Sequence, residues 1–516
     1  MLIKRNFYTY LIVVIMSCFF LLSAYIAYNN TQSQRFGDEV AHWVGGHYVL
    51  QGKELYKDLQ FNHQPLNYYF SAIVETASSP NNLYLFISRQ RFAVFAYGVA
   101  WDIIFLIFFG VITVPIIFIF EIGKYWFSGY KLLGETLAAY PLIFITGVFI
   151  ESLFFKKKLY KLKLILLSIS SFVAGFSLLP LWVVIVPMNA LIFFHAKDKK
   201  NALIYMVVPF LLLTGTLFIF ISPFNLLKET YIYNTQYFLP ATVKFRPSVS
   251  HILLFPFFSL IPPYGPSKIA VAILFVGFLV SGYICIKYKK GIYWLLLLLA
   301  IIGTNFFRVG DMVFSSFHLL PWFGLILTAE IMLTSYLYNQ IKVVMVKTVL
   351  QIKFFVYIII FIYAIFSLNH IWKKKDLANE FYVNYSESEK YGRAIKVLKK
   401  AQDKLLVVPN DPLIYWVADI DTATRILEFY PWFYPIPEYK DEVTKVFTYD
   451  PPAFVVDTGI DLEKNLERYI ATNLKEKYIR IYHLGEPSRL YISKNSISHI
   501  SDEQWKLLED MLFEKP

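Results

Sequence analysis

The sequence predicts a polytopic membrane protein, mainly α-helical, that ends in a soluble α/β domain. Of its 516 residues 57% are hydrophobic and only 17% are charged, whereas about a quarter of the residues of a soluble chain are charged. Long apolar runs follow one another from Tyr8 to Leu368, and charges become frequent after Trp372. We therefore expect a transmembrane domain over residues 1–369 and a soluble domain over residues 370–516.

The first apolar run, Tyr8–Tyr28, has the length of about 20 residues that a helix needs to cross a hydrocarbon core. No small-residue cleavage site follows it, so we interpret it as a signal-anchor helix. Later apolar runs are separated by short basic tracts, which are typical of cytoplasmic loops, and this pattern predicts about eleven crossings. The tracts are Lys4–Arg5, Lys124–Lys131, Lys156–Lys163, Lys197–Lys200, Lys287–Lys290 and Lys342–Lys347.

This topology places the loop 29–91 and the C-terminal domain on the outer side of the membrane. The formal net charge of +12 is explained by the basic tracts between the apolar runs, which are typical of membrane proteins. We therefore do not expect a nucleic-acid partner. The two cysteines, Cys18 and Cys285, both lie inside apolar runs. They are too few for a disulfide framework or a cysteine-based metal site.

Three apolar runs in the first half of the chain need separate interpretation. Phe92–Phe120 is expected to return to the cytoplasm as one helix. Leu132–Phe155 lies between two basic tracts and is short for two helices, so both one crossing and a hairpin bent at Pro141 remain open. Leu164–Phe194 is expected to form two short helices that are broken at Pro180.

The C-terminal domain alternates short apolar runs with amphipathic segments, which indicates a small α/β fold. Asn410-Asp411-Pro412 is a turn and helix-start signal after the first apolar run. The expected strands are Leu405–Val408, Ala453–Asp457, Ile479–His483 and Leu490–Ser493, and the expected helices are Pro412–Ala418 and Leu462–Leu474.

The first outer loop carries the candidate chemistry. Asp38 and Glu39 follow the first membrane exit by about ten residues and precede two amphipathic pieces, Val40–Leu50 and Leu66–Thr76, which are too short to span a bilayer. Carboxylates at that surface can take a proton from a hydroxyl acceptor or hold a divalent cation. The alternative is that both residues only stabilise the N-terminus of the following helix.

The order of motifs in this loop resembles the first outer loop of the GT-C membrane glycosyltransferases, closest to the branch of the protein O-mannosyltransferases and aminoarabinose transferases. Further motifs in the middle, in a late helix and in the C-terminal tail are similar to that family. The matching segments are the pair Asp38-Glu39, Gly52-x-x-Leu-Tyr-x-Asp58, His63-x-Pro-Leu-x-Tyr-Tyr69, Gly175-Phe-Ser-Leu-Leu-Pro180, Phe317-His-Leu-Leu-Pro321, Leu405–Trp416, Arg425, Tyr430-Pro-Trp432 and Pro451–Val456.

The resemblance implies an enzyme that moves a sugar from a polyprenyl-phosphate carrier to a lipid, protein or glycan acceptor on the outer face, with inversion. It implies that Asp38 is the catalytic base and Glu39 its neighbour. Arg89, Arg91 and Arg308, expected at outer helix ends, are candidates for the carrier phosphate. Their alternative role is that of interfacial arginines whose side chains reach toward the headgroups.

Three further residues are candidates for substrate contacts. Asp102 lies inside an apolar run, where a carboxylate is costly and often functional, although it can also pair with a neighbouring Arg or Tyr. His63 and His318 are expected near the outer surface, where satisfied histidines are also common. Glu151 matches the family's second acidic residue by its local motif. Lys156, in a basic tract expected in the cytoplasm, follows so closely that a catalytic role for Glu151 on the outer side is doubtful.

Two other functions remain open from the sequence. A transporter or flippase usually carries broken helices in matching halves, and this chain has one Pro-broken pair. A ligase that attaches a preassembled glycan would show a similar set of motifs. A divalent cation is a possible cofactor, and the expected partners are the polyprenyl-phosphate-linked sugar, membrane lipids and the acceptor.

Overall fold

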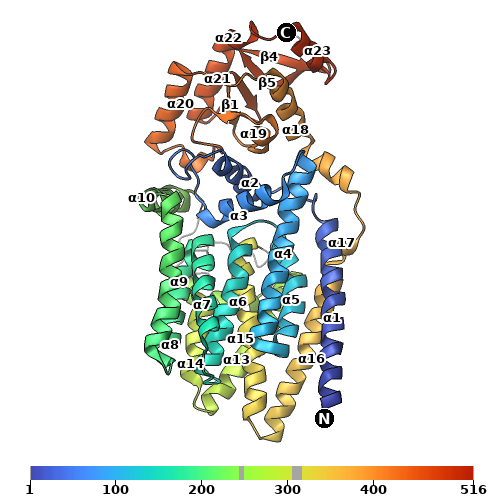
Figure 1. Ribbon diagram of the computed structural model, residues 1–516, viewed down its shortest axis with the longest axis vertical. Helices are drawn as coiled ribbons and strands as arrows, with labels where there is room; N and C mark the ends of the chain where they lie inside the picture. The colour runs from blue at the N-terminus through green and yellow to red at the C-terminus, as the bar shows by residue number, and fades with distance from the viewer. Residues whose placement is uncertain (1, 243–248, 305–315, 515–516) are drawn as a thin grey trace. The chain divides into compact units, whose positions relative to one another are not determined.

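The computed structural model describes residues 2–242, 249–304 and 316–514. They form two compact units (Figure 1), and neither unit is continuous in sequence. Arg308 lies outside the described residues. The helical unit comprises residues 1–31, 91–217 and 245–375, and the α/β unit comprises residues 32–90, 218–244 and 376–516.

The helical unit is built from long helices that are apolar on all sides, which is typical of membrane-spanning helices. Seven segments of the described chain are long and apolar enough to cross a membrane, fewer than the expected eleven crossings. Two shorter apolar helical segments, Leu179–His195 and Gly291–Gly303, accompany them. The seven are Tyr10–Asn29, Leu83–Phe127, Gly134–Leu153, Lys199–Phe220, Pro266–Lys287, Phe317–Gln340 and Val344–Ser367.

The segment Leu83–Phe127 is not one helix, contrary to the expectation for Phe92–Phe120. The helix α4 (Leu83–Phe109) ends before Gly110, whose φ of +75° favours glycine. The next helix, α5 (Val114–Gly123), runs back along α4, because Glu121 of α5 lies next to Gly98 of α4. Phe109, the last residue of α4, packs beside Gly147. The chain therefore reverses direction inside this apolar run.

Of the two interpretations left open for Leu132–Phe155, the hairpin is excluded, because α6 (Gly134–Leu153) is a single helix that contains Pro141. Every residue of α6 is buried. The two basic tracts that flank it therefore cannot both be cytoplasmic loops if α6 crosses the membrane. In the first tract Lys124 is buried and pairs with Glu121 at 2.6 Å.

The break at Pro180 is confirmed: α7 (Lys161–Ser177) and α8 (Trp182–His195) are joined by a short turn at Leu179–Leu181. The core of this unit lies between α6 and α15 (Leu320–Gln340), where Gly324 packs closely against Ile143. The remaining helices are α1 (Leu2–Asn29), α9 (Lys199–Phe220), α12 (Val249–Leu254), α13 (Pro266–Lys287), α14 (Gly291–Gly303), α16 (Val344–Ser367) and α17 (Asn369–Trp372).

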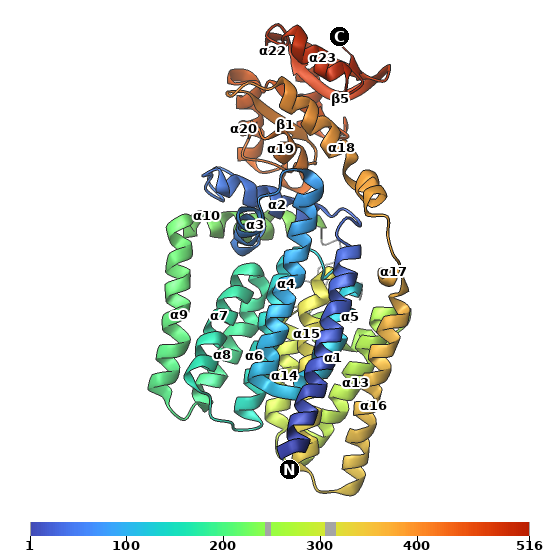
Figure 2. The same cartoon turned by 45° about the vertical axis from the view of Figure 1, so that its right-hand side comes forward.

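At one edge of the unit α1 and α16 lie side by side (Figure 2). Phe19 of α1 stacks on Phe118 of α5 with ring centroids 4.3 Å apart, and Phe361 of α16 lies 5.5 Å from Phe118. Three helices that are distant in sequence thus share one aromatic contact.

The α/β unit contains a six-stranded mixed sheet with the strand order β2-β1-β3-β5-β4-β6. The strand β1 pairs in parallel with β2 and β3, and the other pairings are antiparallel. All four expected strands are present, and so is the expected helix at residues 412–418. The strands are β1 (Lys404–Val408), β2 (Asp421–Thr422), β3 (Phe454–Asp457), β4 (Tyr478–His483), β5 (Glu486–Ser493) and β6 (Phe513–Glu514).

Helices precede, separate and follow the strands of this unit in the sequence. The expected helix 462–474 corresponds to α21 (Asn465–Lys477), which begins three residues later. The others are α10 (Pro223–Leu227), two π-helical turns (Lys228–Ile232 and Asn234–Phe238), α11 (Leu239–Thr242), α18 (Leu377–Leu398), α19 (Leu413–Ala418), α20 (Pro437–Tyr449), α22 (Lys494–Ile497) and α23 (Asp502–Glu509).

The first outer loop belongs to the α/β unit and contributes two helices, α2 (Gly37–Leu50) and α3 (Pro65–Ser78). They pack so closely that an added Cβ on Gly46 would lie 2.7 Å from the backbone oxygen of Tyr68. The Tyr48 hydroxyl donates to the Ile420 carbonyl at 2.9 Å, which ties α2 to the C-terminal segment.

Candidate functional site

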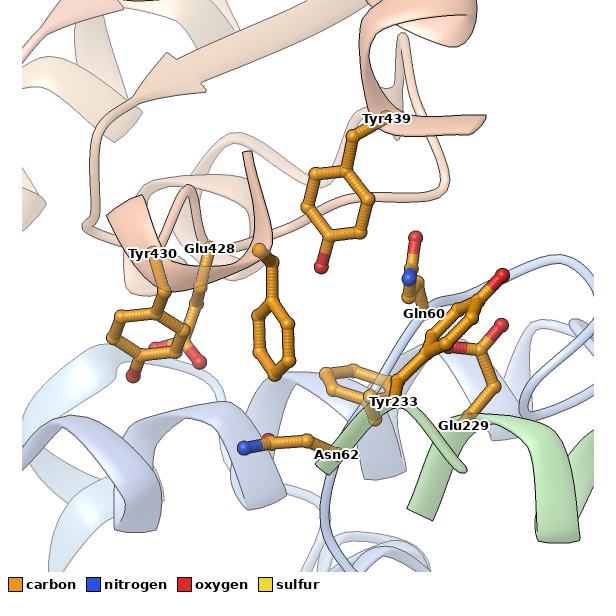
Figure 3. A pocket seen from close by; sticks show the side chains of 9 residues that line it. Gln60, Asn62, Glu229, Tyr233, Glu428, Tyr430 and Tyr439 are labelled. Carbon is orange, nitrogen blue, oxygen red and sulfur yellow. The ribbon is translucent and has the colours of Figure 1, made fainter. Parts of the chain in front are cut away.

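A pocket in the α/β unit gathers polar and aromatic side chains from three separate segments of the chain (Figure 3). Its cavity volume is about 10 Å³, and the space including its open mouth is about 310 Å³. A cavity volume of that size holds about one water molecule or one hydroxyl group. The lining residues are Gln60, Phe61, Asn62, Glu229, Tyr233, Glu428, Tyr430, Phe433 and Tyr439.

Backbone contacts fix the outer-loop side of the pocket. The Gln60 N–H donates to the Arg425 carbonyl at 2.8 Å, so the loop runs beside the segment that carries Glu428. The Asn234 side chain donates to the Asn62 carbonyl at 2.9 Å. Residues 60–62 are therefore held between the C-terminal segment and the π-helical turns.

Glu428 is a buried carboxyl group at one end of the pocket (Figure 3). Burial, followed by the negative charge of Asp38, raises the pKa of Glu428 from 4.5 to about 8. Hydrogen bonds from Tyr430 and Asn410 only partly offset this increase. Glu428 Oε1 nevertheless has no hydrogen-bond partner among the described residues. Near neutral pH Glu428 is therefore mostly protonated and can donate a hydrogen bond.

Glu229 is a second buried carboxyl group at the opposite end of the pocket (Figure 3). Burial raises the pKa of Glu229 to about 7, although the Arg425 guanidinium lies 3.1 Å away and lowers it. The same Arg425 nitrogen donates to the Tyr56 carbonyl at 3.1 Å. This arginine therefore links Glu229 to the outer loop, and the pocket has an acid at each end.

Asp38 lies in the first turn of α2, next to the Glu428 end of the pocket. Its charge acts on Glu428, Tyr430 and Tyr68, and raises the pKa of all three groups. A Cβ added to the preceding residue, Gly37, would lie 3.7 Å from the Tyr430 hydroxyl. The structure thus brings Asp38 together with an acid from the C-terminal segment.

The helix-capping alternative for Asp38 can be compared with the geometry of α2. The N-cap residue is Phe36, and no side chain makes a hydrogen bond at the cap. Asp38 and Glu39 are both within the first turn, where a negative charge favours the helix dipole. Asp38 is partly exposed, whereas Glu39 is fully buried. Only Asp38 of this pair is accessible to a substrate.

Two histidines extend the cluster behind Asp38. His42 lies one helical turn after Asp38 on the same face of α2. Its ring centroid is 4.8 Å from that of His63 and 5.2 Å from that of Tyr68. His63, expected from the sequence as a substrate contact, is therefore near the acid cluster, and His42 was not expected there.

Two of the arginines expected to bind phosphate, Arg89 and Arg91, belong to the described part of the chain. Each of them contacts a backbone carbonyl at the end of a helix. Arg89, in the α/β unit, donates to the carbonyl of Ser78, the last residue of α3. Arg91, in the helical unit, is buried and donates at 3.1 Å to the Thr31 carbonyl just beyond α1. A cation in these positions stabilises a helix C-terminus.

The other candidates lie in the helical unit, where His318 and Glu151 have charged or polar partners. His318 Nδ1 is 2.8 Å from Glu135 Oε1 in the first turn of α6. Asp102 is buried in α4, and neither of its carboxylate oxygens has a hydrogen-bond partner among the described residues. Glu151 pairs with Lys157 at 2.6 Å and with Lys163. Its ion pairs give Glu151 a structural role.

No set of three or more His, Cys, Asp and Glu side chains in the described part of the chain has the geometry of a metal site. The divalent cation expected as a possible cofactor therefore has no three-ligand protein site in this part of the chain, and we derive no step through it.

Sequence reasoning missed Glu428 and Glu229. Glu428 precedes the Tyr430-Pro431-Trp432 motif by two residues, and this proximity was the only available signal. Glu229 follows the apolar run that ends at Ile221, and no motif surrounds it.

Comparison with known proteins gives a match by structure and none by sequence. No protein-family model matches the chain, and no curated protein matches it. A crystal structure of ArnT from Cupriavidus metallidurans bound to undecaprenyl phosphate superposes with a TM-score of 0.56 at 11% identity, covering 93% of this chain and 97% of that one. The chain has the fold of ArnT. The apo crystal structure of the same protein matches with a TM-score of 0.48 at 10% identity, covering 95% of this chain and 98% of that one.

The ArnT fold confirms the resemblance that the sequence motifs predicted, at the level of architecture. The match covers both the helical unit and the α/β unit, since it leaves only a small part of either chain unmatched. At 11% identity it carries no residue of a site from one protein to the other.

Proposed function

We propose that this protein is a glycosyltransferase that moves a sugar from a polyprenyl-phosphate carrier to an acceptor on the outer face of the membrane. The observation that carries the proposal is Asp38, a partly exposed carboxylate beside the buried acid Glu428 in a protein with the ArnT fold. The ArnT crystal structure that it resembles contains undecaprenyl phosphate, which supports the choice of carrier.

In the proposed reaction Asp38 takes the proton of the acceptor hydroxyl as its oxygen attacks the anomeric carbon. The bond from that oxygen to the anomeric carbon forms, and the bond from the carbon to the phosphate oxygen breaks. The electron pair of the broken bond stays on the phosphate, which leaves as polyprenyl phosphate. The configuration at the anomeric carbon of the sugar is inverted. Glu428, protonated near neutral pH, can donate a hydrogen bond to an oxygen of the bound substrate.

The test is a transfer assay with purified full-length protein, radiolabelled polyprenyl-phosphate sugars and a lipid extract as the source of acceptors. We expect Asp38→Asn to lower the rate by about 10²–10⁴-fold, the usual contribution of a general base. Asn keeps the shape of the side chain, so the variant should unfold at the wild-type temperature.

Asp441→Asn is the matched control, because Asp441 is exposed on α20. If Asp38→Asn transferred sugar as fast as the Asp441→Asn control, Asp38 would not be the base. If the wild-type protein consumed no polyprenyl-phosphate sugar, the proposed activity itself would be wrong.

A further inference from the structure

The pocket offers buried hydrogen-bonding groups without any cationic side chain. Of its nine lining residues none is Lys, Arg or His, and two are Glu. A phosphate or other anion is therefore disfavoured, because it would meet two acids with Asp38 close by. Two cations of the described chain contact lining residues, and each already has an acidic partner. Arg425 pairs with Glu229. Lys228, whose Nζ lies 5.2 Å from the Tyr233 ring centroid, pairs with Glu438 at 3.2 Å.

An apolar ligand is disfavoured as well. Glu428 Oε1 is buried and has no partner among the described residues. A hydrocarbon chain in the pocket would leave this oxygen unsatisfied, which disfavours its binding. A hydroxyl group would satisfy it, either as a donor to the carboxylate or as an acceptor from the protonated acid.

Aromatic rings surround the polar groups. Tyr430 stacks on Trp432 with ring centroids 4.7 Å apart, and Tyr439 directs its hydroxyl into the pocket (Figure 3). Aromatic faces pack well against the C–H face of a sugar ring, while amide and carboxyl groups bind its hydroxyls. Asn62 and Gln60 supply the amides here. The combination is typical of saccharide binding.

We propose that this pocket binds one hydroxyl group of a saccharide, whose ring packs on Tyr430, the partly exposed aromatic residue of the lining, and that the acceptor is therefore a glycan. The inference rests on the proposed function in one respect, namely that the bound saccharide is the acceptor. The cavity volume of about 10 Å³ sets its scale, since one hydroxyl group enters and the ring stays outside. Glu428 then contacts this hydroxyl on one side and lies beside Asp38 on the other.

Binding is measured without any donor, by calorimetry on the full-length protein in detergent. The probes are methyl glycosides of the common hexoses and pentoses at millimolar concentrations, with glycerol and glucose 6-phosphate as comparisons. We expect saturable binding of at least one methyl glycoside, and no binding of glycerol or of the phosphorylated sugar.

Two pocket variants and one control locate the binding. Glu428→Met removes both carboxyl oxygens at similar volume and should weaken binding about tenfold, the effect of a lost hydrogen bond to a buried acid. Asn62→Ala, at a half-buried position, should weaken it with little risk to folding. Glu463→Met, at an exposed position, should leave the affinity unchanged.

Failure of this inference can be distinguished from failure of the proposed function. If no methyl glycoside bound saturably, or if Asn62→Ala and Glu428→Met both bound as tightly as the control, the pocket would not be a saccharide site. Transfer to a lipid or protein acceptor would then still support the enzyme. Glycoside binding that depends on Glu428, in a protein that consumes no carrier, would support the site and overturn the activity.

Discussion

Glu428 has two neighbours that matter for chemistry: the pocket on one side and Asp38 on the other. Burial, followed by the negative charge of Asp38, raises the pKa of Glu428, so that Glu428 keeps its proton to higher pH than an exposed carboxyl group. This environment is consistent with the proposed roles, in which Asp38 accepts a proton and Glu428 donates a hydrogen bond.

The raised pKa of Glu428 predicts a pH dependence of stability. The folded protein holds this proton up to pH of about 8, whereas the unfolded chain loses it near 4.5. The stability that Glu428 contributes is thus present below pH 4.5 and is lost as the pH rises to about 8. Glu428→Gln cannot titrate, so its unfolding temperature minus that of the wild type should increase between pH 5 and pH 8.5.

Thermal unfolding in detergent across this pH range measures the difference. Glu229, whose pKa is raised to about 7, acts in the same direction in both proteins and cancels in the subtraction. A constant difference between the two curves would mean that Glu428 titrates normally.

The three arginine candidates are tested by substitution with lysine. Lys keeps the charge but loses the bidentate fork that fits a phosphate. If at least one of Arg89, Arg91 and Arg308 binds the carrier phosphate, its Lys variant should show impaired turnover with polyprenyl-phosphate sugar.

Arg89 and Arg91 also bind the carbonyls of Ser78 and Thr31. Unfolding temperatures therefore have to be measured beside the rates. Wild-type turnover in all three Lys variants would remove the phosphate role and leave Arg89 and Arg91 as helix-end contacts.

At the scale of elements, three helices of the helical unit share one buried ion pair. Lys353 of α16 lies 2.7 Å from Glu330 of α15 and donates to Ser281 of α13 at 2.6 Å. The Tyr357 hydroxyl donates to Glu330 at 2.8 Å. All of these groups are buried, so the pair is satisfied only as long as the three helices stay together.

Removal of one partner should be more harmful than removal of both. Lys353→Met leaves the Glu330 carboxylate buried without its cation, which typically costs about 3–5 kcal/mol. The double variant Glu330→Leu with Lys353→Met has no unpaired charge and should recover much of that loss. Unfolding temperatures of the two single variants and the double variant measure the coupling, and simple additivity would contradict this account.

Elements with a strong local signal were predictable from the sequence. The runs Leu405–Val408 and Pro412–Ala418 are bounded by turn residues, and both elements are found within a residue of the expected positions. The run Phe92–Phe120 misled because its apolar character is continuous across the reversal, which takes place in the short turn Gly110–Thr113. Lys124 to Lys131 resembled a loop because sequence does not reveal that Glu121 pairs with Lys124 inside the bundle.

At the scale of the whole molecule, the candidate site could be predicted only in part. Asp38 was a candidate from the sequence because it lies in a recognisable order of motifs. Glu428 and Glu229 reach the same unit from segments far along the chain, and no local pattern encodes that meeting. His42 was missed because a histidine on an apolar face is usually a buried residue without special function.

The α/β unit is formed by segments from both halves of the chain, and this arrangement predicts part of the membrane topology. Residues 32–90 and 376–516 fold together, so they must lie on the same side of the membrane. With Cys18 and Cys285 replaced by Ser, cysteines at the exposed positions Asn81 and Ser498 should both react with an impermeant reagent on intact cells.

A cysteine at Lys158 is the control for this experiment. It lies in a basic tract between α6 and α7, which the positive-inside rule places in the cytoplasm, so it should stay unlabelled until the membrane is opened. Labelling of only one of Asn81 and Ser498 would contradict the shared side.

The assembly of one unit from an early and a late segment has a consequence for biosynthesis. The helices α2 and α3 leave the ribosome before nearly all of the bundle exists, yet Tyr48 and Arg35 find their partners, Ile420 and Asp411, only near the end of translation. During that interval the buried faces of the two helices are exposed to chaperones and proteases. This delay leaves the nascent chain open to degradation. It also means that Asp38 and Glu428 come together only after nearly the whole chain has been synthesised.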